Sequence, residues 1–453
     1  MAARFGPRSI ASFYRSLIHE ALAWQWPRAV RECQQGANLR RIIRHAYNHV
    51  PFYRAHLDRA GVAPEEIRTP ADLWRIPSIC KEDLRAAGTE GLDRRVDAAS
   101  LMKGGTGGTT GLRLTLYSSP EELARHGGYS WSPWIAAGLR AHDRILSVGS
   151  SFARWAPPPW RTVWIDTTLS VDDRIRILER YRPTVIIGLL DSVLLLAREV
   201  SRRVLCSKLR LRRVFVFGYA CTSDARRIIR EGLGVDPIDC YGTRETIWVG
   251  IQCEARDGYH VPSHRLVVQV ASIARPGQPA GPSEVGELVL TDLARQIMPF
   301  IRYRLEDAGR LIDDPCPCGR PGPRIVDLQG RILDLFIGKD GSAIGPETLR
   351  VYELQYDGVV EDFRLTQVSR QEVRLEYIPG PNWDMGALRR TEAEVSGALG
   401  GVKVVEERVA RMSVDPEAKL RRYVRKIPLP ADVWISGFRN PGLPPTPAGE
   451  YWW

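Results

Sequence analysis

Hydrophobic and polar residues follow two different periodic patterns in the first two-thirds of the chain. Over residues 9–54, apolar residues recur at helical spacing among many arginines, which predicts helices packed on a larger body. Between about residues 101 and 270, short β-rich runs alternate with amphipathic stretches. The expected strands are 144–148, 184–188, 213–217 and 235–239, with helices at 172–181 and 223–231. Such alternation predicts an α/β domain with parallel sheet layers.

The pattern of apolar and polar positions changes toward the C-terminus. Residues 281–291 and 299–312 read as strands with tight turns, so the sheet is expected to continue there in a more antiparallel style. After Asp334, strand patterns at 363–368, 372–377 and 402–406 accompany a helix pattern at 385–399. Since 453 residues exceed what one core usually serves, we predict a large domain over 1–333 and a small α+β domain over 334–430. The tail, residues 431–453, has no periodicity and is expected to be an irregular strap or mobile.

Composition narrows the class of protein. Hydrophobic residues make up 44% and charged residues 26%, which is ordinary for a globular protein. The net charge of +11 raises one alternative, a basic, zinc-stabilised nucleic-acid-binding protein. The arginines are spread along the chain and form no concentrated basic face, so we expect no nucleic-acid partner.

The chain also lacks a signal-peptide core and a run of about 18 apolar residues, so a cytoplasmic protein without a membrane role is expected. Eight cysteines are too sparse for a disulfide scaffold and are expected to be thiols or metal ligands.

A glycine- and threonine-rich loop is the first candidate for chemistry. Residues 103–111 read Lys-Gly-Gly-Thr-Gly-Gly-Thr-Thr-Gly. Consecutive glycines let backbone N–H groups converge, and threonine hydroxyls add donors, which makes a concave anion site. The loop does not end in the Gly-Lys-Ser/Thr of the common ATPase motif, and a simple flexible turn remains the alternative.

Two acidic positions follow further along the chain. Tyr241-Gly242-Thr243-Arg244-Glu245 comes directly after an apolar run, where a strand end presents residues to a crevice. Glu245 could hold Mg²⁺, or it could be a surface acid in a turn. Asp307 ends the run 299–307 and is a candidate to accept the two hydroxyls of a ribose.

Taken in order with residues 330–334 (Gly-Arg-Ile-Leu-Asp) and 418–422 (Ala-Lys-Leu-Arg-Arg), these segments resemble the acyl-adenylate-forming superfamily. The phenylacetate-CoA ligase branch, with its capsule-biosynthesis relatives, is the most similar, and the likeness covers roughly residues 15–428. It implies that a substrate carboxylate attacks the α-phosphate of ATP, that pyrophosphate leaves, and that an acceptor then displaces AMP. ATP and Mg²⁺ are the implied cofactors.

The resemblance also assigns roles to individual residues. The phosphates would lie on Thr106, Gly107, Gly108, Thr109, Thr110 and Gly111, and the rest of the nucleotide against Gly218, Tyr219, Tyr241, Gly242, Thr243, Asp307 and Arg331. Of these residues, Gly218, Tyr219 and Tyr241 would flank the adenine. Lys419 would be catalytic together with Glu245 and Thr109. Asp334 would be the hinge of a mobile C-terminal domain. The sequence departs from the family at residues 112–113, at 418 and at 305–306, where Leu-Glu replaces the usual Thr-Gly.

Cys253, His260, Cys316 and Cys318 form a candidate metal site. Three thiolates and one imidazole are a ligand set of structural Zn²⁺, although Cys-x-Cys is a less usual spacing than Cys-x-x-Cys. Ordinary cysteines and a histidine are the alternative. The resemblance favours zinc, because branches with this Cys-Pro-Cys-Gly-Arg segment pair it with such an upstream Cys and His.

Aromatic residues after the glycine loop suggest the kind of substrate. Tyr129, Trp131 and Trp134 fall where the family builds its pocket wall, which favours an aromatic carboxylate, although a tryptophan stripe is also typical of a core. The resemblance implies coenzyme A as acceptor, with an amine and an amide product as the alternative. A homodimer is left open.

Overall fold

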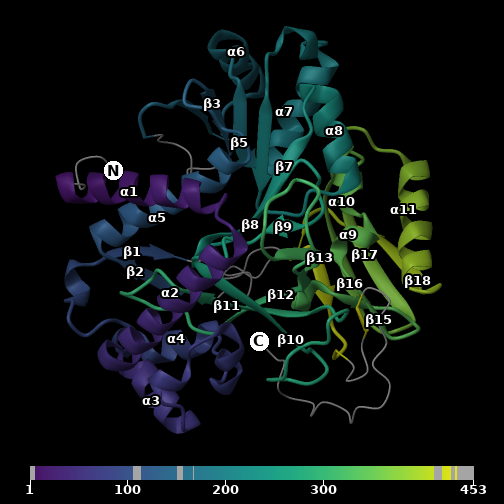
Figure 1. Cartoon of the computed structure of the whole chain (residues 1–453). Helices are drawn as coiled ribbons and strands as arrows, with labels where there is room; N and C mark the ends of the chain where they lie inside the picture. Colours follow the sequence, from purple (N-terminus) through teal and green to yellow (C-terminus); the bar gives the residue numbers. More distant parts are fainter. Residues whose placement is uncertain are drawn as a thin grey trace. The chain divides into compact units, whose positions relative to one another are not determined.

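The structure is a computed structural model that describes residues 6–105, 114–149, 157–166, 168–412, 421–429 and 434–435 (Figure 1). The chain divides into two compact units. Unit 1 comprises Met1–Arg28, Pro120–Pro262 and Asp313–Arg324, and unit 2 comprises Ala29–Ser119, Ser263–Ile312 and Ile325–Trp453.

Unit 1 is built on a mixed sheet whose strands run in the order β9-β8-β7-β6-β5-β3-β4. The strands are β3 (Arg144–Val148), β4 (Arg161–Ile165), β5 (Val185–Leu189), β6 (Arg213–Phe217), β7 (Pro237–Thr243), β8 (Ile247–Gln252) and β9 (Tyr259–His260). The strands from β4 to β7 are parallel, and β8 and β9 are antiparallel to their neighbours. Parallel strands are covered on both faces, which explains their almost continuous apolar sequences. The predicted parallel layers are confirmed.

Helices cover the sheet of unit 1. They are α1 (Pro7–Ala23), α5 (Pro120–Ala136), α6 (Val171–Tyr181), α7 (Leu190–Arg202) and α8 (Ser223–Leu233), and a short 3₁₀ turn lies at Cys206–Lys208. α7 and α8 run beside β5 and β7 (Figure 1). Side chains of Ser170 and Thr222 cap the first turns of α6 and α8, which fixes where both predicted helices begin. α1 approaches α5 closely because Gly128 has no side chain: a Cβ there would stand 2.1 Å from the Ser16 hydroxyl.

Unit 2 begins with helices α2 (Arg28–His49), α3 (Pro51–Ala60) and α4 (Lys81–Ala87). Short 3₁₀ turns lie at Pro64–Glu66, Pro70–Arg75, Gly88–Gly91 and Ala98–Ser100. β1 (Met102–Gly105) and β2 (Thr115–Ser118) form an antiparallel pair. Four longer strands follow in the order β10 (Leu266–Ala271), β11 (Gly286–Asp292), β12 (Tyr303–Ile312) and β13 (Arg324–Arg331). β10, β11 and β12 pair in antiparallel, as the sequence pattern predicts.

The C-terminal part of unit 2 has a core of its own. The 3₁₀ turn Ile332–Asp334 leads into β14 (Phe336–Ile337), β15 (Ser342–Ile344), α9 (Pro346–Leu349), α10 (Tyr352–Tyr356), β16 (Val360–Gln367), β17 (Glu372–Pro379), α11 (Met385–Ala398), β18 (Lys403–Arg408), β19 (Tyr423–Arg425) and β20 (Trp434–Ile435). The order β18-β17-β16-β19 makes a four-stranded sheet. Phe363, Leu375 and Val395, from two strands and α11, lie in one cluster of fully buried side chains. The smaller C-terminal sheet is therefore confirmed, and a domain boundary at Asp334 stays a prediction.

Among the described residues, none of the helices combines the length and the apolar character that crossing a bilayer requires.

Candidate functional site

The turn between β7 and β8 holds the predicted magnesium ligand. Only glycine fits at Gly242, because a Cβ there would stand 2.0 Å from the carbonyl oxygen of Ile247. The pairing of β7 with β8 shifts register at this point, and Ile247 has a left-handed φ of 70°. The Thr243 hydroxyl accepts the Thr246 N–H at 3.3 Å and closes the turn. The tight turn leaves Glu245 only 8% exposed, and a carboxylate oxygen is a ligand that Mg²⁺ prefers.

The predicted adenine-flanking residues meet at one edge of the unit 1 sheet. β6 and β7 are parallel neighbours in which Phe217 stands opposite Cys240. Gly218, the first residue after β6, and Tyr241, a residue near the end of β7, therefore lie where the parallel pairing ends, on the side of the sheet where α/β folds bind ligands. Gly218 has a φ of 99°, which turns the chain away from β6, and Tyr219 is 46% exposed.

The predicted ribose ligand and its arginine lie in unit 2. Asp307 is a half-buried residue of β12, and Arg331 ends β13. The Arg331 guanidinium (Nη1) lies 3.4 Å from the Glu306 carboxylate (Oε2). The sequence patterns did not single out Glu306 as a partner of Arg331. Its signal was the departure from the family at this position.

Glu306 also has an unusual backbone. β12 bulges here, because Ala308 pairs with Glu287 and Arg304 pairs with Val289, which leaves three residues of β12 opposite a single residue of β11. Glu306 takes a left-handed φ of 61°, a conformation that disfavours side chains other than glycine by about 1–2 kcal/mol. Burial raises the pKa of the Glu306 carboxyl, and the charge of Arg331 opposes that shift. A glycine at this position would avoid that cost.

The predicted hinge residue has a partner close to the predicted catalytic lysine in sequence. Asp334 (Oδ1) lies 2.6 Å from Arg421 (Nη2), which also donates to the carbonyl oxygen of Leu333 at 3.1 Å. Arg425 donates to the carbonyl oxygen of Ile332 at 3.5 Å. Strand β19 is thereby tied to the 3₁₀ turn that ends at Asp334.

Several predicted residues lie outside the described part of the chain. They are Thr106, Gly107, Gly108, Thr109, Thr110, Gly111 and Lys419. The strands on either side of the glycine loop are described: Gly105 of β1 pairs with Thr115 of β2. The candidate phosphate loop therefore joins the two strands of an antiparallel hairpin.

The three aromatic residues assigned to the substrate lie on α5. Trp134 has no exposed surface, and its ring lies 5.7 Å from that of Trp248. Trp131 is 4% exposed and stacks on Trp160 at 5.1 Å. Tyr129 is half-buried. Both tryptophans belong to the hydrophobic core of unit 1, and their place in a substrate pocket stays a prediction.

The four candidate metal ligands come together within unit 1. Their ligand atoms all lie within 4.8 Å of one another. The sulfur atoms of Cys253 and Cys316 are 3.6 Å apart, and Cys318 Sγ lies 3.4 Å from His260 Nε2. Zinc–sulfur bonds of 2.3 Å in a tetrahedron put two sulfurs about 3.8 Å apart, so the chain already has the spacing that a bound zinc ion requires. The donor set and its spacing fit the metal.

Neighbouring contacts hold the two ligand-bearing segments in place. Arg324 is 1% exposed and donates both to the carbonyl oxygen of Asp314 at 2.7 Å and to the Asp257 carboxylate at 2.8 Å. Val261 donates its N–H to the carbonyl oxygen of Pro323 at 3.0 Å. These bonds join the β8–β9 hairpin to the Cys-Pro-Cys segment without any metal, and a tetrahedral ion would add a second connection.

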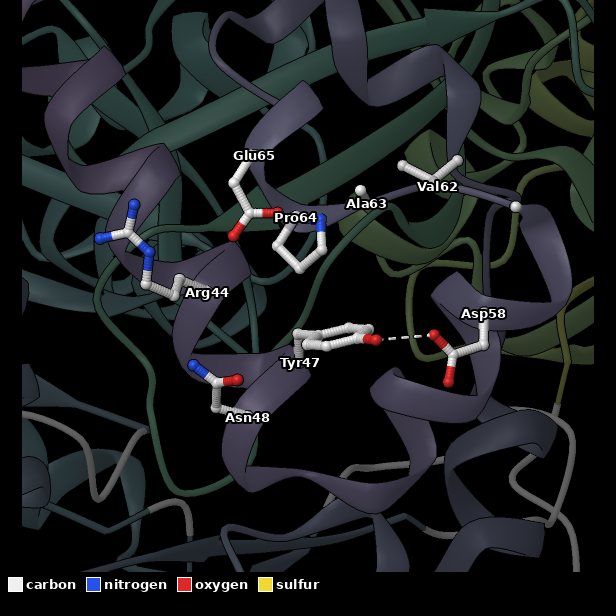
Figure 2. Close-up of a pocket in the computed structure, with 9 residues that line it drawn as sticks. Arg44, Tyr47, Asn48, Asp58, Val62, Ala63, Pro64 and Glu65 are labelled. Atoms are coloured by element: carbon white, nitrogen blue, oxygen red, sulfur yellow. Dashed lines mark hydrogen bonds between the residues drawn. The ribbon is translucent and has the colours of Figure 1, made fainter.

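A separate pocket of about 510 Å³ lies among the first helices of unit 2. Figure 2 shows Tyr47 pointing toward Asp58, to which its hydroxyl donates at 2.9 Å. Arg44 and Glu65 also line the pocket. Its lining includes no described member of the predicted site.

No protein-family model matches the chain. A phenylacetate-coenzyme A ligase from Thermus thermophilus is 29% identical over 362 residues, which cover 77% of this chain and 80% of that protein. Among solved structures, 2-hydroxyisobutyryl-CoA ligase in the postadenylation state superposes with a TM-score of 0.72 at 21% identity, over 89% of this chain and 91% of that one. o-Succinylbenzoate coenzyme A synthetase from Bacillus subtilis, in complex with ATP and a magnesium ion, gives 0.50 at 17% identity, over 72% and 69%.

Proposed function

Because the chain belongs to the acyl-adenylate-forming superfamily, as a distant relative of the phenylacetate-CoA ligases, we propose that it is an AMP-forming acid–CoA ligase. It activates a carboxylic acid with ATP, releases pyrophosphate and transfers the acyl group to coenzyme A. The observation that carries this proposal is the convergence of Gly218 and Tyr241, beside the turn that holds Glu245, at the carboxyl ends of β6 and β7.

The reaction proceeds in two displacements. A carboxylate oxygen forms a bond to the α-phosphorus, and the bond to the bridging oxygen breaks, so that pyrophosphate leaves. The thiol sulfur of coenzyme A then bonds to the acyl carbon as its proton is lost, and AMP leaves. Both steps are accelerated mainly by positioning and by neutralising phosphate charge.

Each residue has a place in that scheme. Tyr241, with Gly218 and Tyr219, flanks the adenine, and Asp307 accepts the ribose hydroxyls. The loop Thr106 to Gly111 donates N–H and hydroxyl groups to the phosphates, while Gly242 and Thr243 support the turn of Glu245. Glu245 would hold a magnesium ion that neutralises phosphate oxygens. Lys419 brings an ammonium to the carboxylate and the α-phosphate, a role for which a compact charge suits better than arginine.

We further propose an aromatic acid as substrate and a structural zinc ion on Cys253, His260, Cys316 and Cys318. Support for an aromatic acid comes from the likeness to phenylacetate-CoA ligases and from the half-buried Tyr129. Support for zinc comes from the ligand spacing. The ion would cross-link two segments of unit 1 that Arg324 already joins.

The test is pyrophosphate release with a panel of aromatic and aliphatic carboxylic acids, with and without coenzyme A. Glu245→Gln and Lys419→Ala are expected to lower kcat/KM by about 100-fold or more, because each removes a charge that faces the phosphates. Lys403→Ala, at an exposed lysine of β18, is the matched control and should keep wild-type activity.

Each outcome bears on a different part of the proposal. Wild-type rates in the Glu245→Gln and Lys419→Ala variants would disprove the residue roles. Absence of pyrophosphate release with every acid would disprove adenylation itself. Mass analysis of products formed with amines in place of coenzyme A decides between the thioester and the amide.

A further inference from the structure

Asp239 is a buried carboxylate in unit 1 for which the proposed reaction has no use. It lies on β7, two residues before Tyr241, and is 3% exposed. One of its oxygens, Oδ2, accepts the Tyr259 hydroxyl at 2.7 Å and the Cys221 backbone N–H at 3.1 Å. A carboxylate is costly to bury, so its two donors point to a structural demand at this position.

The sheet topology places Tyr259 within reach of Asp239. β8 lies between β7 and β9, and Tyr241 of β7 pairs with Gly250 of β8. A Cβ on Gly250 would stand 2.8 Å from the Cβ of Tyr259. Glycine inside a strand often marks such a close approach. The side chain of Tyr259 therefore crosses β8 where Gly250 leaves space and reaches β7.

Two contacts extend from this pair toward the predicted adenine position. The ring of Tyr259 meets the ring of Tyr241 edge to face, with centroids 6.1 Å apart. Cys221, which donates to Asp239, belongs to the connection from β6 to α8 that also carries Gly218 and Tyr219. One hydrogen-bonded pair thus contacts both the strand residue and the loop that flank the adenine in the proposed function.

We propose that Tyr259 and Asp239 are positioning residues for the nucleotide: they hold the Tyr241 ring and the loop from Gly218 to Cys221 in the arrangement that receives adenine. The inference rests on the proposed function and deepens it. A site whose aromatic and backbone groups are already in place loses less conformational freedom on binding, so the pair acts on nucleotide affinity rather than on the chemical step.

Tyr259→Phe is the first test, because it keeps the ring and removes only the hydroxyl. We expect the KM for ATP to rise roughly tenfold, as for the loss of a hydrogen bond to a charged group, with kcat and the KM for the acid within about twofold of wild type. Asp239→Asn, which keeps the shape of the side chain, should move the same constant. The bound-zinc content of both variants should equal that of wild type.

Tyr53→Phe is the matched control. Tyr53 is a fully buried tyrosine of unit 2 whose hydroxyl donates to the carbonyl oxygen of Pro299 at 2.8 Å. The Tyr53→Phe variant removes a tyrosine hydrogen bond in unit 2 and should leave the KM for ATP unchanged. An equal rise of that KM in Tyr53→Phe, or no rise in Tyr259→Phe and Asp239→Asn, would overturn the inference.

Calorimetry of ATP binding separates the two levels of the proposal. If wild type binds ATP and Tyr259→Phe binds it with the same Kd, the positioning role is wrong and the proposed function stands. If wild type binds no ATP, the proposed function is wrong and the inference falls with it. Weaker binding by Tyr259→Phe, with Tyr53→Phe at the wild-type Kd, supports both.

Discussion

Individual buried acids of this chain differ in how their charge is balanced. Burial raises the pKa of Asp239 to about 6, although hydrogen bonds from the Tyr259 hydroxyl and the Cys221 N–H, together with the charge of Arg226, oppose that shift. Asp143 is also buried, but it accepts hydrogen bonds from the Thr184 hydroxyl, the Arg140 N–H and the Arg212 guanidinium. Burial opposes those bonds, yet they hold the pKa of Asp143 below its ordinary value. The two acids therefore respond to pH in opposite directions.

The raised pKa of Asp239 predicts a pH-dependent stability. The folded-state pKa of about 6 exceeds the ordinary 3.8, so the folded chain binds this proton more tightly than the unfolded chain. The resulting stabilisation is complete below pH 3.8 and is lost as the pH rises through 6. Because Asp239→Asn does not titrate, the free energy of unfolding of wild type relative to this variant should fall by about 2 kcal/mol between pH 4 and pH 7.

Urea denaturation of both proteins across that range measures the difference. Asp143→Asn is the control: its lowered pKa confines the change to acid pH, so its difference from wild type should stay nearly constant from pH 4 to pH 7. Parallel curves for wild type and Asp239→Asn would show that Asp239 is not perturbed.

At the residue scale, sequence motifs predict those site residues whose roles are determined within a short segment of the chain. The sequence singles out Cys253, His260, Cys316 and Cys318, and the structure brings them together. The motifs did not predict Glu306 as a partner of Arg331 or Tyr259 as a partner of Asp239. The first contact arises from a bulge in β12, and the second arises because the Tyr259 side chain crosses β8 at Gly250. Contacts of that kind depend on strand pairing, which no spacing within one segment reveals.

At the scale of elements, the β8–β9 hairpin and the Cys-Pro-Cys segment form the candidate metal centre. The hairpin is short, and β9 has only two residues, so hydrogen bonding within it fixes little. Arg324 and the N–H of Val261 supply the other connections between the segments. We infer that a bound ion adds stability mainly to this corner of unit 1.

Removing one metal ligand tests that inference. Elemental analysis should find about one zinc ion per chain in wild type and none in Cys316→Ser. Its melting temperature should also fall, since an ion present at a thousand times its Kd stabilises the folded state by about 4 kcal/mol. Cys33→Ser, at an exposed cysteine outside the cluster, is the control and should retain both zinc and melting temperature. Metal-free wild type that melts like Cys33→Ser would contradict a structural ion.

Element prediction was most accurate where burial or capping acts locally. The strands predicted at 144–148 and 213–217 match β3 and β6, because runs buried on both faces are continuous in sequence. Helices were predicted over residues 9–54 without individual bounds, and the structure has three helices there, α1, α2 and α3. Pro51 begins the third, since proline suits the first turn of a helix. β4 was not predicted, because it lies at the end of the sheet and only one of its five residues is buried, so its sequence lacks a continuous buried run.

At the scale of the whole molecule, the proposed reaction requires one active site to carry out two different chemical steps, adenylation and thioester formation. The C-terminal part of unit 2, with its separate core, begins directly after Asp334. The Asp334–Arg421 pair lies at that junction. A hinge at Asp334, if it turns between the steps, must change backbone angles at this residue.

Asp334→Pro tests the hinge, because proline fixes φ near −65°. We expect pyrophosphate release in the first turnover to stay within about threefold of wild type, while thioester formation falls at least tenfold, since only the second step requires the turn. Asp334→Ala is the control: it removes the pair with Arg421 but leaves φ free, and it should support both steps. Equal losses of both steps in the proline variant would contradict a hinge at this position.

The order in which the chain is synthesised gives the metal centre a further meaning. The chain leaves unit 1 after Pro262 and returns at Asp313, having formed β10, β11 and β12 in between. Cys253 and His260 therefore emerge from the ribosome before β10, β11 and β12 are synthesised, and Cys316 and Cys318 emerge after them. Neither half of the ligand set can complete a tetrahedron alone, and closing so long a loop costs only slightly more entropy than closing a short one. A metal ion could therefore bind all four ligands only after β10, β11 and β12 have been synthesised. Its binding would make the return of the chain to unit 1 difficult to reverse.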